Sequence, residues 1–450
     1  KHIKQLGLDS VFNNSNAITT FVPTNEAFES LSDTLKDMET LMKYHISPTL
    51  FILRNVEGKR KLQTLSEKFA LLEYRDGSYW IDNVEILSSS PLHKDGVYYK
   101  IKEVAVPQPN LYQYMEQYSP LFSQYIDKQD SVYLDQELST PIGFNDEDNT
   151  VYDSVITSVN LFERDYFYVT EEFRNKTATL VIPSSQQYNE ALTEMAGNLG
   201  PSFTSYEDIP QRWQFDKLIP FIFNHGMFGG MLDPIEFQRE RLKNIIGDSV
   251  VVDYTPVNKT LCSNGLAYEY AEFNIPDSLY MGNIRIEGEE LVDSLGKDSY
   301  AWSDSVSISG ETTFEPEIVR VDVASNKQIA NVDFGLDFTG QYSIEFDIHN
   351  VFPMQYRFAW RATYRSAGLY AIYVNGEKMR EFDLYNLRSK IFSESLQTFL
   401  YPQEGYNIVD FTVNNITRFG DVHIKIEYLG TGESSKNGLN IDYIELIPNL

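Results

Sequence analysis

The chain has 450 residues, enough for about three domains with cores of their own. Its formal net charge of −28 argues against nucleic-acid binding and against anionic lipid surfaces, because nothing would offset the repulsion from phosphate groups. The single cysteine, Cys262, excludes an intrachain disulfide and is expected to be a small buried side chain. No apolar run is long enough to span a membrane.

A pattern of strand, proline turn and capped helix occurs twice in the first two thirds of the chain. The run Ile18–Val22 predicts a buried strand, Pro23 ends it, and Thr24 is a residue type that caps helices. The same order recurs at Ala178–Ile182 and Pro183, followed by two serines. A repeat of this length indicates two related domains in tandem.

Each copy closes with a turn dipeptide and an alternating strand. The first turn contains Gly96 and leads to Pro107, and the second contains Gly265 and leads to Pro276. Each domain is therefore expected to combine a helical first half with a strand-rich second half, which is an α+β arrangement.

These segments resemble the signature segments of a known family. Thr20–Phe28, Tyr44-His45 and Gly96–Pro107 are similar to the conserved elements of the fasciclin domain, and the resemblance covers roughly residues 1–109. It implies a structural and interaction role for Tyr44 and His45. We expect the histidine to be packed and hydrogen-bonded rather than catalytic or metal-binding.

The second copy is more divergent. Asn224 stands where the first copy has its tyrosine, and it precedes His225. Residues 110–292 are expected to form a second fasciclin-like domain, with leading helices that begin near Leu111. The resemblance assigns a structural role to Pro23, Thr24, Tyr44, His45, Gly96, Pro107, Pro183, His225 and Gly265.

The composition changes after about residue 293. The stretch 293–310 is rich in Ser, Asp and Gly and is interpreted as a linker or an edge strand. From 311 to 450 short β-type runs dominate, such as Tyr342–Ile348 and Gly368–Val374, and Asn375-Gly376 is a typical hairpin turn. This region predicts an all-β sandwich or jelly roll.

The segments Tyr370–Glu377 and Leu439–Leu446 resemble those of galactose-binding-like jelly rolls, a fold shared by many carbohydrate-binding modules. Such modules bind sugars through exposed aromatic faces with nearby hydrogen-bonding groups. Trp360 has an alternative interpretation as a core residue of the sandwich. The candidate ligand-binding residues are Trp360, Tyr364, Tyr356, Arg361 and Arg365.

Some modules of this type hold a structural calcium ion near the first and last strands. Glu315, Glu317 and Asp442 are the candidate ligands here, because carboxylate oxygens suit calcium, although no matching first-strand signature is found. The acidic run 145–149 lacks the glycine and the distal glutamate of an EF-hand loop and is interpreted as a solvated loop.

The predicted fold class is α+β fasciclin-like domains in tandem followed by an all-β jelly-roll sandwich. No phosphate loop, zinc motif or nucleophile elbow is present in the sequence. The predicted function is therefore non-catalytic: adhesion or glycan binding at the cell surface, as an accessory to outer-membrane glycan capture. The expected partner is an extracellular glycan or a cell-surface protein. The alternatives are a structural scaffold that contacts an outer-membrane protein complex and an unrecognised glycosidase.

The expected location is outside the cell, with attachment as a lipoprotein. The chain begins at Lys1 without a methionine, so an export segment is expected to have been removed. The triplet of Asp, Ser or Thr, and an aliphatic residue recurs, as at Asp9-Ser10-Val11, and resembles an O-glycosylation motif of exported proteins in Gram-negative bacteria.

Overall fold

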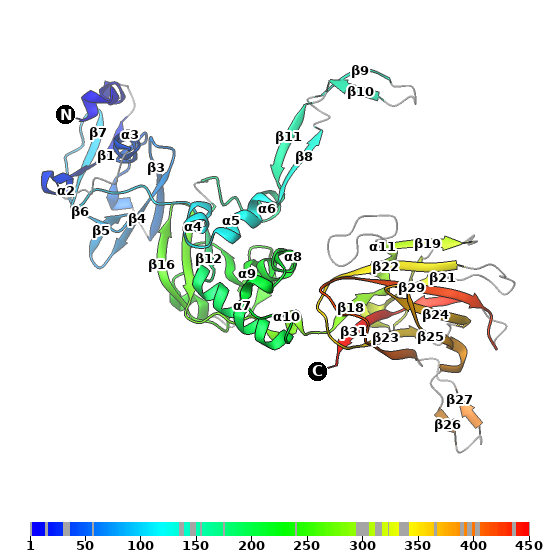
Figure 1. Ribbon diagram of the computed structural model, residues 1–450. Helices are drawn as coiled ribbons and strands as arrows, with labels where there is room; N and C mark the ends of the chain where they lie inside the picture. Colours follow the sequence, from blue (N-terminus) through cyan, green and yellow to red (C-terminus); the bar gives the residue numbers. More distant parts are fainter. Residues whose placement is uncertain are drawn as a thin grey trace. The chain divides into compact units, whose positions relative to one another are not determined.

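The computed structural model of the chain forms two compact units (Figure 1). The first comprises residues 1–191 and 219–273, and the second comprises residues 192–218 and 274–450. The residues that the structure describes are 2–13, 17–29, 37–55, 58–134, 139–144, 150–153, 155–173, 176–238, 241–293, 306–310, 317–322, 324–332, 342–363, 367–387, 391–393, 398–400, 406–433 and 438–449.

The first domain is built on a seven-stranded sheet with the order β2-β1-β7-β6-β5-β4-β3. Its second and third strands, β1 and β7, are parallel, and the other neighbouring strands are antiparallel. The strands are β1 (Ile18–Pro23), β2 (Ile46–Ser47), β3 (Lys59–Gln63), β4 (Phe69–Arg75), β5 (Ser78–Ile81), β6 (Val84–Ser89) and β7 (Gly96–Ile101).

Short helices connect the strands of this sheet. Thr24 Oγ1 accepts a hydrogen bond from Ala27 N at 3.1 Å, so the predicted cap does begin the helix that follows β1. Phe21, Tyr44 and Tyr99 are buried in the core beneath the sheet. The helices are α1 (His2–Gln5), η1 (Leu8–Asn13), α2 (Asn25–Glu29), α3 (Met38–Tyr44) and η2 (Leu53–Asn55).

The second domain contains a four-stranded sheet with the order β13-β12-β17-β16. Its strands are β12 (Ala178–Val181), β13 (Met227–Gly229), β16 (Pro256–Cys262) and β17 (Gly265–Tyr270), and a small ribbon pairs β14 (Leu242–Lys243) with β15 (Ser249–Val250). The helical elements are α4 (Leu111–Tyr118), α5 (Pro120–Asp127), α6 (Leu161–Asp165), α7 (Ser185–Leu199), η3 (Tyr206–Asp208), α8 (Gln211–Trp213), η4 (Gln214–Leu218), α9 (Ile219–Gly226), η5 (Pro234–Gln238) and α10 (Asp277–Tyr280).

The sheet of the second domain repeats the arrangement of β2-β1-β7-β6. β12 pairs in parallel with β17 and antiparallel with β13, as β1 pairs with β7 and β2. The buried hydroxyl of Thr19 donates to Thr49 O at 2.8 Å and accepts from Phe51 N at 2.7 Å. Thr179 makes the same two bonds, at 2.7 and 2.8 Å, with the backbone that follows β13. The sequence repeat thus corresponds to a repeated local structure.

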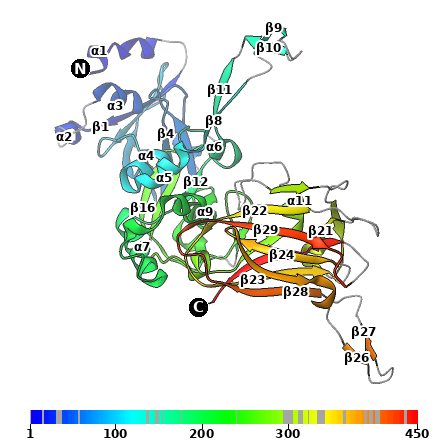
Figure 2. The ribbon, with the colours of Figure 1, turned by 45° about the vertical axis from the view of Figure 1, so that its right-hand side comes forward.

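A two-stranded extension, called the arm below, leaves the second domain between α5 and α6 (Figures 1 and 2). We define the arm as residues 130–160. Its base pairs β8 (Asp130–Leu134) with β11 (Ile156–Asn160), and its tip pairs β9 (Thr140–Phe144) with β10 (Thr150–Asp153). The acidic run 145–149 lies outside the described residues.

The C-terminal part is a β-sandwich, as the sequence predicts. One sheet has the order β18-β31-β23-β28, the other has the order β19-β22-β29-β24-β25, and a three-stranded sheet β20-β21-β30 lies in the same unit. The elements are β18 (Ile284–Glu287), α11 (Gly288–Asp293), β19 (Val306–Gly310), β20 (Glu317–Arg320), η6 (Ser325–Lys327), β21 (Gln328–Val332), β22 (Tyr342–Val351), β23 (Tyr356–Thr363), β24 (Leu369–Val374), β25 (Glu377–Asp383), η7 (Leu384–Leu387), β26 (Ile391–Ser393), β27 (Thr398–Leu400), β28 (Tyr406–Val413), β29 (Gly420–Gly430), β30 (Leu439–Ile441) and β31 (Tyr443–Pro448).

The sandwich begins earlier than the sequence suggests. β18 was expected to belong to the second domain, but it pairs antiparallel with β31 in the register Ile284↔Leu446. Residues 306–310 form the edge strand β19, paired with β22, so the linker interpretation is wrong for them and the edge-strand alternative holds. Both strands are too short to stand out in the sequence, and only their pairing with distant strands assigns them to the sandwich.

Candidate functional site

Two of the three aromatic candidates for ligand binding lie in the core. Trp360 and Tyr356 are 0% and 1% exposed, and both occupy the inner face of β23. The Trp360 indole N–H donates to Asn440 O at 3.3 Å, and the Tyr356 hydroxyl donates to Phe352 O at 2.9 Å. This corrects the expectation from the sequence, because a ring enclosed by other side chains cannot stack on a sugar. The alternative, a core tryptophan, is what the structure contains.

Arg361 lies on the opposite face of β23, and its guanidinium group already contacts other side chains of the sandwich. Its guanidinium group lies 3.1 Å from Asp442 Oδ2 and 5.6 Å from the centre of the Tyr443 ring. These contacts make it a structural residue of the outer face rather than a free hydrogen-bond donor. Tyr364 and Arg365, the remaining two candidates, lie outside the described residues.

An acidic cluster lies where the first and last strands of the sandwich meet. It consists of Glu287 at the end of β18, Glu289 in α11, and Asp442, which is fully buried between β30 and β31. The η6 turn contacts all three carboxyl groups. Ser325 N donates to Asp442 and Ser325 Oγ to Glu287, at 2.8 and 3.0 Å, and Asn326 Nδ2 donates to Glu289 at 3.2 Å.

The cluster has more negative charge than its protein partners balance. Burial raises the pKa of Glu287, and the carboxyl groups of Glu289 and Asp442 raise it further. Burial also raises the pKa of Asp442, against the lowering effect of Arg361. Glu287 Oε2 and Glu289 Oε2 are buried without a hydrogen-bond partner. Buried carboxylate oxygens that lack donors fit the needs of a hard cation such as Ca²⁺.

Of the candidate calcium ligands that were named from the sequence and that the structure describes, only Asp442 is found in this cluster. Glu317 is exposed in β20 and accepts a hydrogen bond from Asn331 at 3.3 Å. Glu315 lies outside the described residues. Within the described part of the chain, no three acidic, histidine or cysteine side chains already converge tightly enough to coordinate a metal. Glu287 and Glu289 were missed because they precede the expected start of the sandwich.

The tyrosine and histidine of the first domain are structural. The Tyr44 hydroxyl donates to Asp82 inside the core, and the second Asp82 oxygen accepts from Leu71 N at 2.7 Å. His45 is buried, its Nδ1 pairs with Leu41 O at 2.7 Å, and its Nε2 accepts from Ala105 N at 3.1 Å. Burial lowers the pKa of His45. The prediction of a packed, hydrogen-bonded histidine is confirmed.

The corresponding residues of the second domain occupy similar positions. His225 Nδ1 pairs with Phe221 O, four residues earlier, at 2.8 Å, as His45 does with Leu41. A Cβ atom at Gly96 or Gly265 would overlap the carbonyl oxygen of the paired residue in β1 or β12. These glycines are therefore required for close strand pairing.

The signature prolines follow the strands. Pro23 is the last residue of β1, Pro183 comes two residues after β12, and Pro107 lies beyond β7. Cys262 is buried as predicted, and burial raises the pKa of its thiol to about 12.

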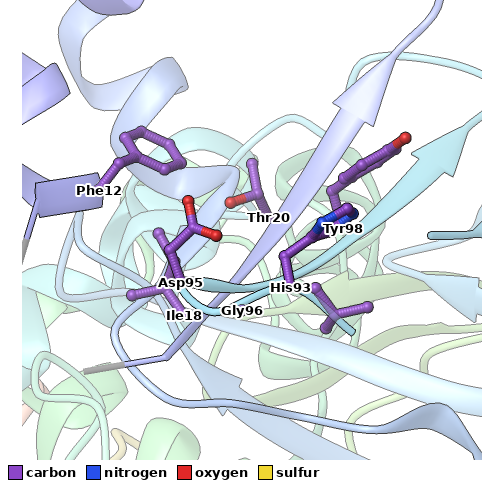
Figure 3. Close-up of a pocket in the computed structure, with 8 residues that line it drawn as sticks. Phe12, Ile18, Thr20, His93, Asp95, Gly96 and Tyr98 are labelled. Atoms are coloured by element: carbon purple, nitrogen blue, oxygen red, sulfur yellow. The ribbon is translucent and has the colours of Figure 1, made fainter. Parts of the chain in front are cut away.

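A surface hollow of about 290 Å³ lies at the end of the parallel strand pair of the first domain (Figure 3). In Figure 3 the Asp95 carboxyl group and the Thr20 hydroxyl lie between the rings of Phe12 and Tyr98. The Tyr98 ring stacks on His93 with ring centres 6.0 Å apart and an angle of 10°. The hollow is lined by Phe12, Ile18, Thr20, His93, Asp95, Gly96, Val97 and Tyr98.

This hollow combines aromatic surface with hydroxyl, carboxylate and imidazole groups. Tyr98 is 48% exposed, and Asp95 and His93 are also exposed, so these groups are accessible. Its volume is slightly below the range typical of drug-sized ligands, which suits a group of about one sugar ring. Sequence reasoning missed the site because Phe12 and Asp95 are distant in the chain. The Asp95-Gly96 turn beside Tyr98 was the one feature of the local sequence that pointed to this part of the hollow.

Comparison with known families identifies the first domain. A family model of the fasciclin domain matches residues 1–107. Residues 1–107 therefore form a fasciclin domain. A search of curated proteins finds no match. No described helix is both long and apolar enough to cross a membrane.

Solved structures with similarity to the chain include carbohydrate-binding modules. A family 35 module from Clostridium thermocellum has 12% sequence identity, with 37% of this chain and 98% of the module covered and a TM-score of 0.23. A module of the same family from Paenibacillus barcinonensis has 16% identity, with 37% and 99% covered and a TM-score of 0.23. A Paenibacillus xanthan lyase has 15% identity, with 42% of this chain and 16% of the lyase covered and a TM-score of 0.26.

Proposed function

We propose that this chain is a non-catalytic adhesion or glycan-binding protein of the cell surface, exported and anchored at the outer membrane as a lipoprotein. Its partner would be an extracellular glycan or a cell-surface protein. The fasciclin domain at residues 1–107 supports this assignment, because such domains are typically extracellular. The net charge of −28 is consistent with this proposal, because a strongly acidic chain disfavours nucleic-acid binding and the proposed function does not require it.

We include a second, divergent fasciclin-like domain at residues 110–281 in the proposal. The parallel pair β12–β17 with its antiparallel neighbours supports it, as does the shared hydrogen bonding of Thr19 and Thr179. The C-terminal sandwich would then begin near Ile284, where β18 pairs with the last strand.

The observation that carries glycan binding is the hollow of Figure 3. Sugars present flat C–H faces that pack on aromatic rings and hydroxyl groups that need hydrogen-bond partners. The Tyr98 ring supplies a surface for the C–H face, and the Asp95 carboxyl group and the Thr20 hydroxyl group supply hydrogen-bond partners. One small, open site of this kind binds weakly, so useful affinity would require several sites to engage the same glycan.

A glycan array probed with the full chain tests this proposal. Hits should be titrated by calorimetry with the wild type, Tyr98→Ala and Asp95→Asn. We expect each variant to weaken binding at least about tenfold, the effect of losing roughly 1.4 kcal/mol of contact energy. Tyr74→Ala is the matched control, because Tyr74 lies in the same domain and is 50% exposed. Binding that survives both substitutions, or no glycan bound at all, would reject this site.

The acidic cluster of the sandwich supports a structural role for calcium. Glu287, Glu289 and Asp442 would hold the ion, which would supply positive charge to the orphaned oxygens and tie β18 to the end of β30. A structural calcium ion at this place is compatible with either proposed function of the protein.

The alternative function is a scaffold that contacts an outer-membrane protein complex. The specific observation in its favour is the arm, which exposes large apolar side chains such as Phe144 and Ile156. The two functions are separable, because the arm and the hollow share no residue.

A further inference from the structure

The arm makes no sheet with the rest of the described chain. β8 pairs only with β11, and β9 only with β10. Its base is fixed to the domain, because Asn160 Nδ2 donates to Ile126 O at 2.7 Å and to Asp130 Oδ1 at 2.8 Å. Figures 1 and 2 show the two ribbons following one another away from α5 and α6. The base is thus anchored while the ribbon keeps both edges open.

Among the described residues of the arm, large apolar side chains are exposed both at the base and at the tip. Phe144 and Ile142, near the end of β9, are 73% and 67% exposed. At the base, Val132 and Ile156 are 70% and 69% exposed, and the register Ser158↔Val132 places them on one face of the ribbon. An isolated two-stranded ribbon is only marginally stable in water, and exposed apolar groups of this kind mark interaction sites.

The arm is also uniformly acidic. Residues 130–160 include seven Asp or Glu residues and no Lys, Arg or His. A second copy of this chain, with a net charge of −28, would be repelled, and so would an anionic lipid surface. Charge complementarity therefore selects a partner with basic groups around an apolar surface.

We propose that the arm is a docking element for a protein whose contact surface is an apolar groove bordered by Lys and Arg side chains. Phe144 and Ile142 enter the groove, and the basic rim complements the net negative charge of the arm. The open edges of the ribbon allow the partner to add a strand. This inference is independent of glycan binding in the hollow of the first domain.

A photo-cross-linking experiment in the cells that make the chain tests the proposal. p-Benzoylphenylalanine replaces Phe144 in the full chain, and the same residue at Ile235, which is 72% exposed on the same unit, provides the control. We expect one protein to cross-link from position 144 and not from 235, through a peptide that contains both apolar and basic residues. The purified partner is then titrated with the full chain by calorimetry.

The titration separates the apolar and the charged contributions. We expect Ile142→Ser combined with Phe144→Ser to raise Kd at least about tenfold. Ile235→Ser should leave Kd unchanged, and 500 mM salt should weaken binding severalfold. Since the substituted side chains are exposed, unfolding of the variants should match the wild type, which excludes misfolding as the cause.

Four outcomes would overturn the proposal. The first is cross-linking from position 144 no stronger than from position 235, and the second is cross-linking only to a second copy of this chain. The third is binding that is insensitive to salt. The fourth is Phe144-dependent flotation with phosphatidylcholine vesicles, which would make the arm a lipid anchor. Unchanged glycan binding by the Ile142→Ser, Phe144→Ser variant would show that the two sites are independent.

Discussion

At the scale of single residues, the buried carboxyl group of Asp82 organises the core of the first domain. It accepts hydrogen bonds from Tyr44 and from Leu71 N, which would favour the ionised form. Burial outweighs these bonds and raises the pKa of Asp82 to about 7, from an ordinary value of 3.8. Between about pH 4 and pH 7 the Asp82 carboxyl group is therefore protonated in the folded state and ionised in the unfolded chain.

This pKa predicts a pH dependence of stability. The Asp82 contribution to the free energy of unfolding is fully present below about pH 4 and is lost as the pH rises to about 7. We expect Asp82→Asn to remove this loss, so that stability between pH 4.5 and 7.5 becomes flatter. Urea unfolding at several pH values measures it, with the exposed Asp76→Asn as control. An unchanged slope in Asp82→Asn would contradict the assignment.

Gly96 provides a second test at this scale. Its φ is +135°, and a Cβ would overlap the Ile18 carbonyl oxygen. Gly77 also has a positive φ, +81°, but open space around it. We expect Gly77→Ala to cost about 1 kcal/mol and Gly96→Ala clearly more, because only Gly96 combines strain with a backbone clash. Denaturant unfolding compares them, and equal losses would mean that the strand pair can separate.

At the scale of elements, the two faces of β23 have different roles. Tyr356, Phe358 and Trp360 point into the core, whereas Arg357 and Arg361 lie on the outer face. The period of two predicted which residues share a face, but not which face the second sheet covers. The packing of the two sheets around Trp360 determined which face of β23 is buried.

Trp360→Ala should therefore change stability and leave ligand binding alone. We expect the sandwich to lose about 3 to 5 kcal/mol of unfolding free energy, because a fully buried indole leaves a large cavity. Arg357→Ala, on the exposed face of the same strand, should cost at most about 1 kcal/mol. Calorimetric unfolding of the full chain distinguishes them. A stable Trp360→Ala variant with impaired glycan binding would restore Trp360 as a ligand-binding candidate.

At the scale of the whole molecule, contacts between distant segments connect the modules within each unit. In the first unit, Glu172 accepts hydrogen bonds from Phe69 N at 3.0 Å, from Ser263 Oγ at 2.6 Å and from Lys68 Nζ at 3.3 Å. One carboxylate thus links β4 of the fasciclin domain to the turn before β17. In the second unit, Trp213 packs on Phe352 with ring centres 5.5 Å apart.

Removal of Glu172 should weaken the link between the first two domains. Glu172→Ala removes the counter-ion of the mostly buried Lys68 ammonium group and the acceptor of Phe69 N and Ser263 Oγ, which costs about 2 to 4 kcal/mol. We expect the fasciclin domain to unfold at a lower temperature than the rest of its unit. Scanning calorimetry follows this, with the exposed Glu116→Ala as control. A single thermal unfolding transition at the wild-type temperature would show that contacts other than those of Glu172 couple the two domains.

We expect calcium to stabilise the sandwich as a whole, because the proposed ligands lie in or next to its first and last strands. At a calcium concentration 100 times Kd, we expect a gain of about 2.7 kcal/mol over EDTA. Glu287→Gln with Glu289→Gln should abolish the gain, whereas Glu317→Gln should retain it. Thermal unfolding with and without calcium provides the measurement. Stabilisation that persists in the double variant would place the ion elsewhere.

The sequence alone determined the features that contiguous residues encode. The repeated pattern, the cap at Thr24 and the alternating strands of the sandwich follow from local composition and spacing, and the fasciclin resemblance implies the structural role of His45. The fasciclin resemblance at residues 1–109 agrees with the family match at 1–107. These features hold because backbone geometry and capping depend on nearest neighbours along the chain.

Only the tertiary structure decided which distant residues meet. It paired Ile284–Glu287 with the last strand, and this brought Glu287 and Glu289 to Asp442. It enclosed Trp360 and placed Phe12 beside Asp95 in the hollow. Burial and charge clustering depend on the packing of elements that are far apart in sequence, and local patterns carry no information about that packing.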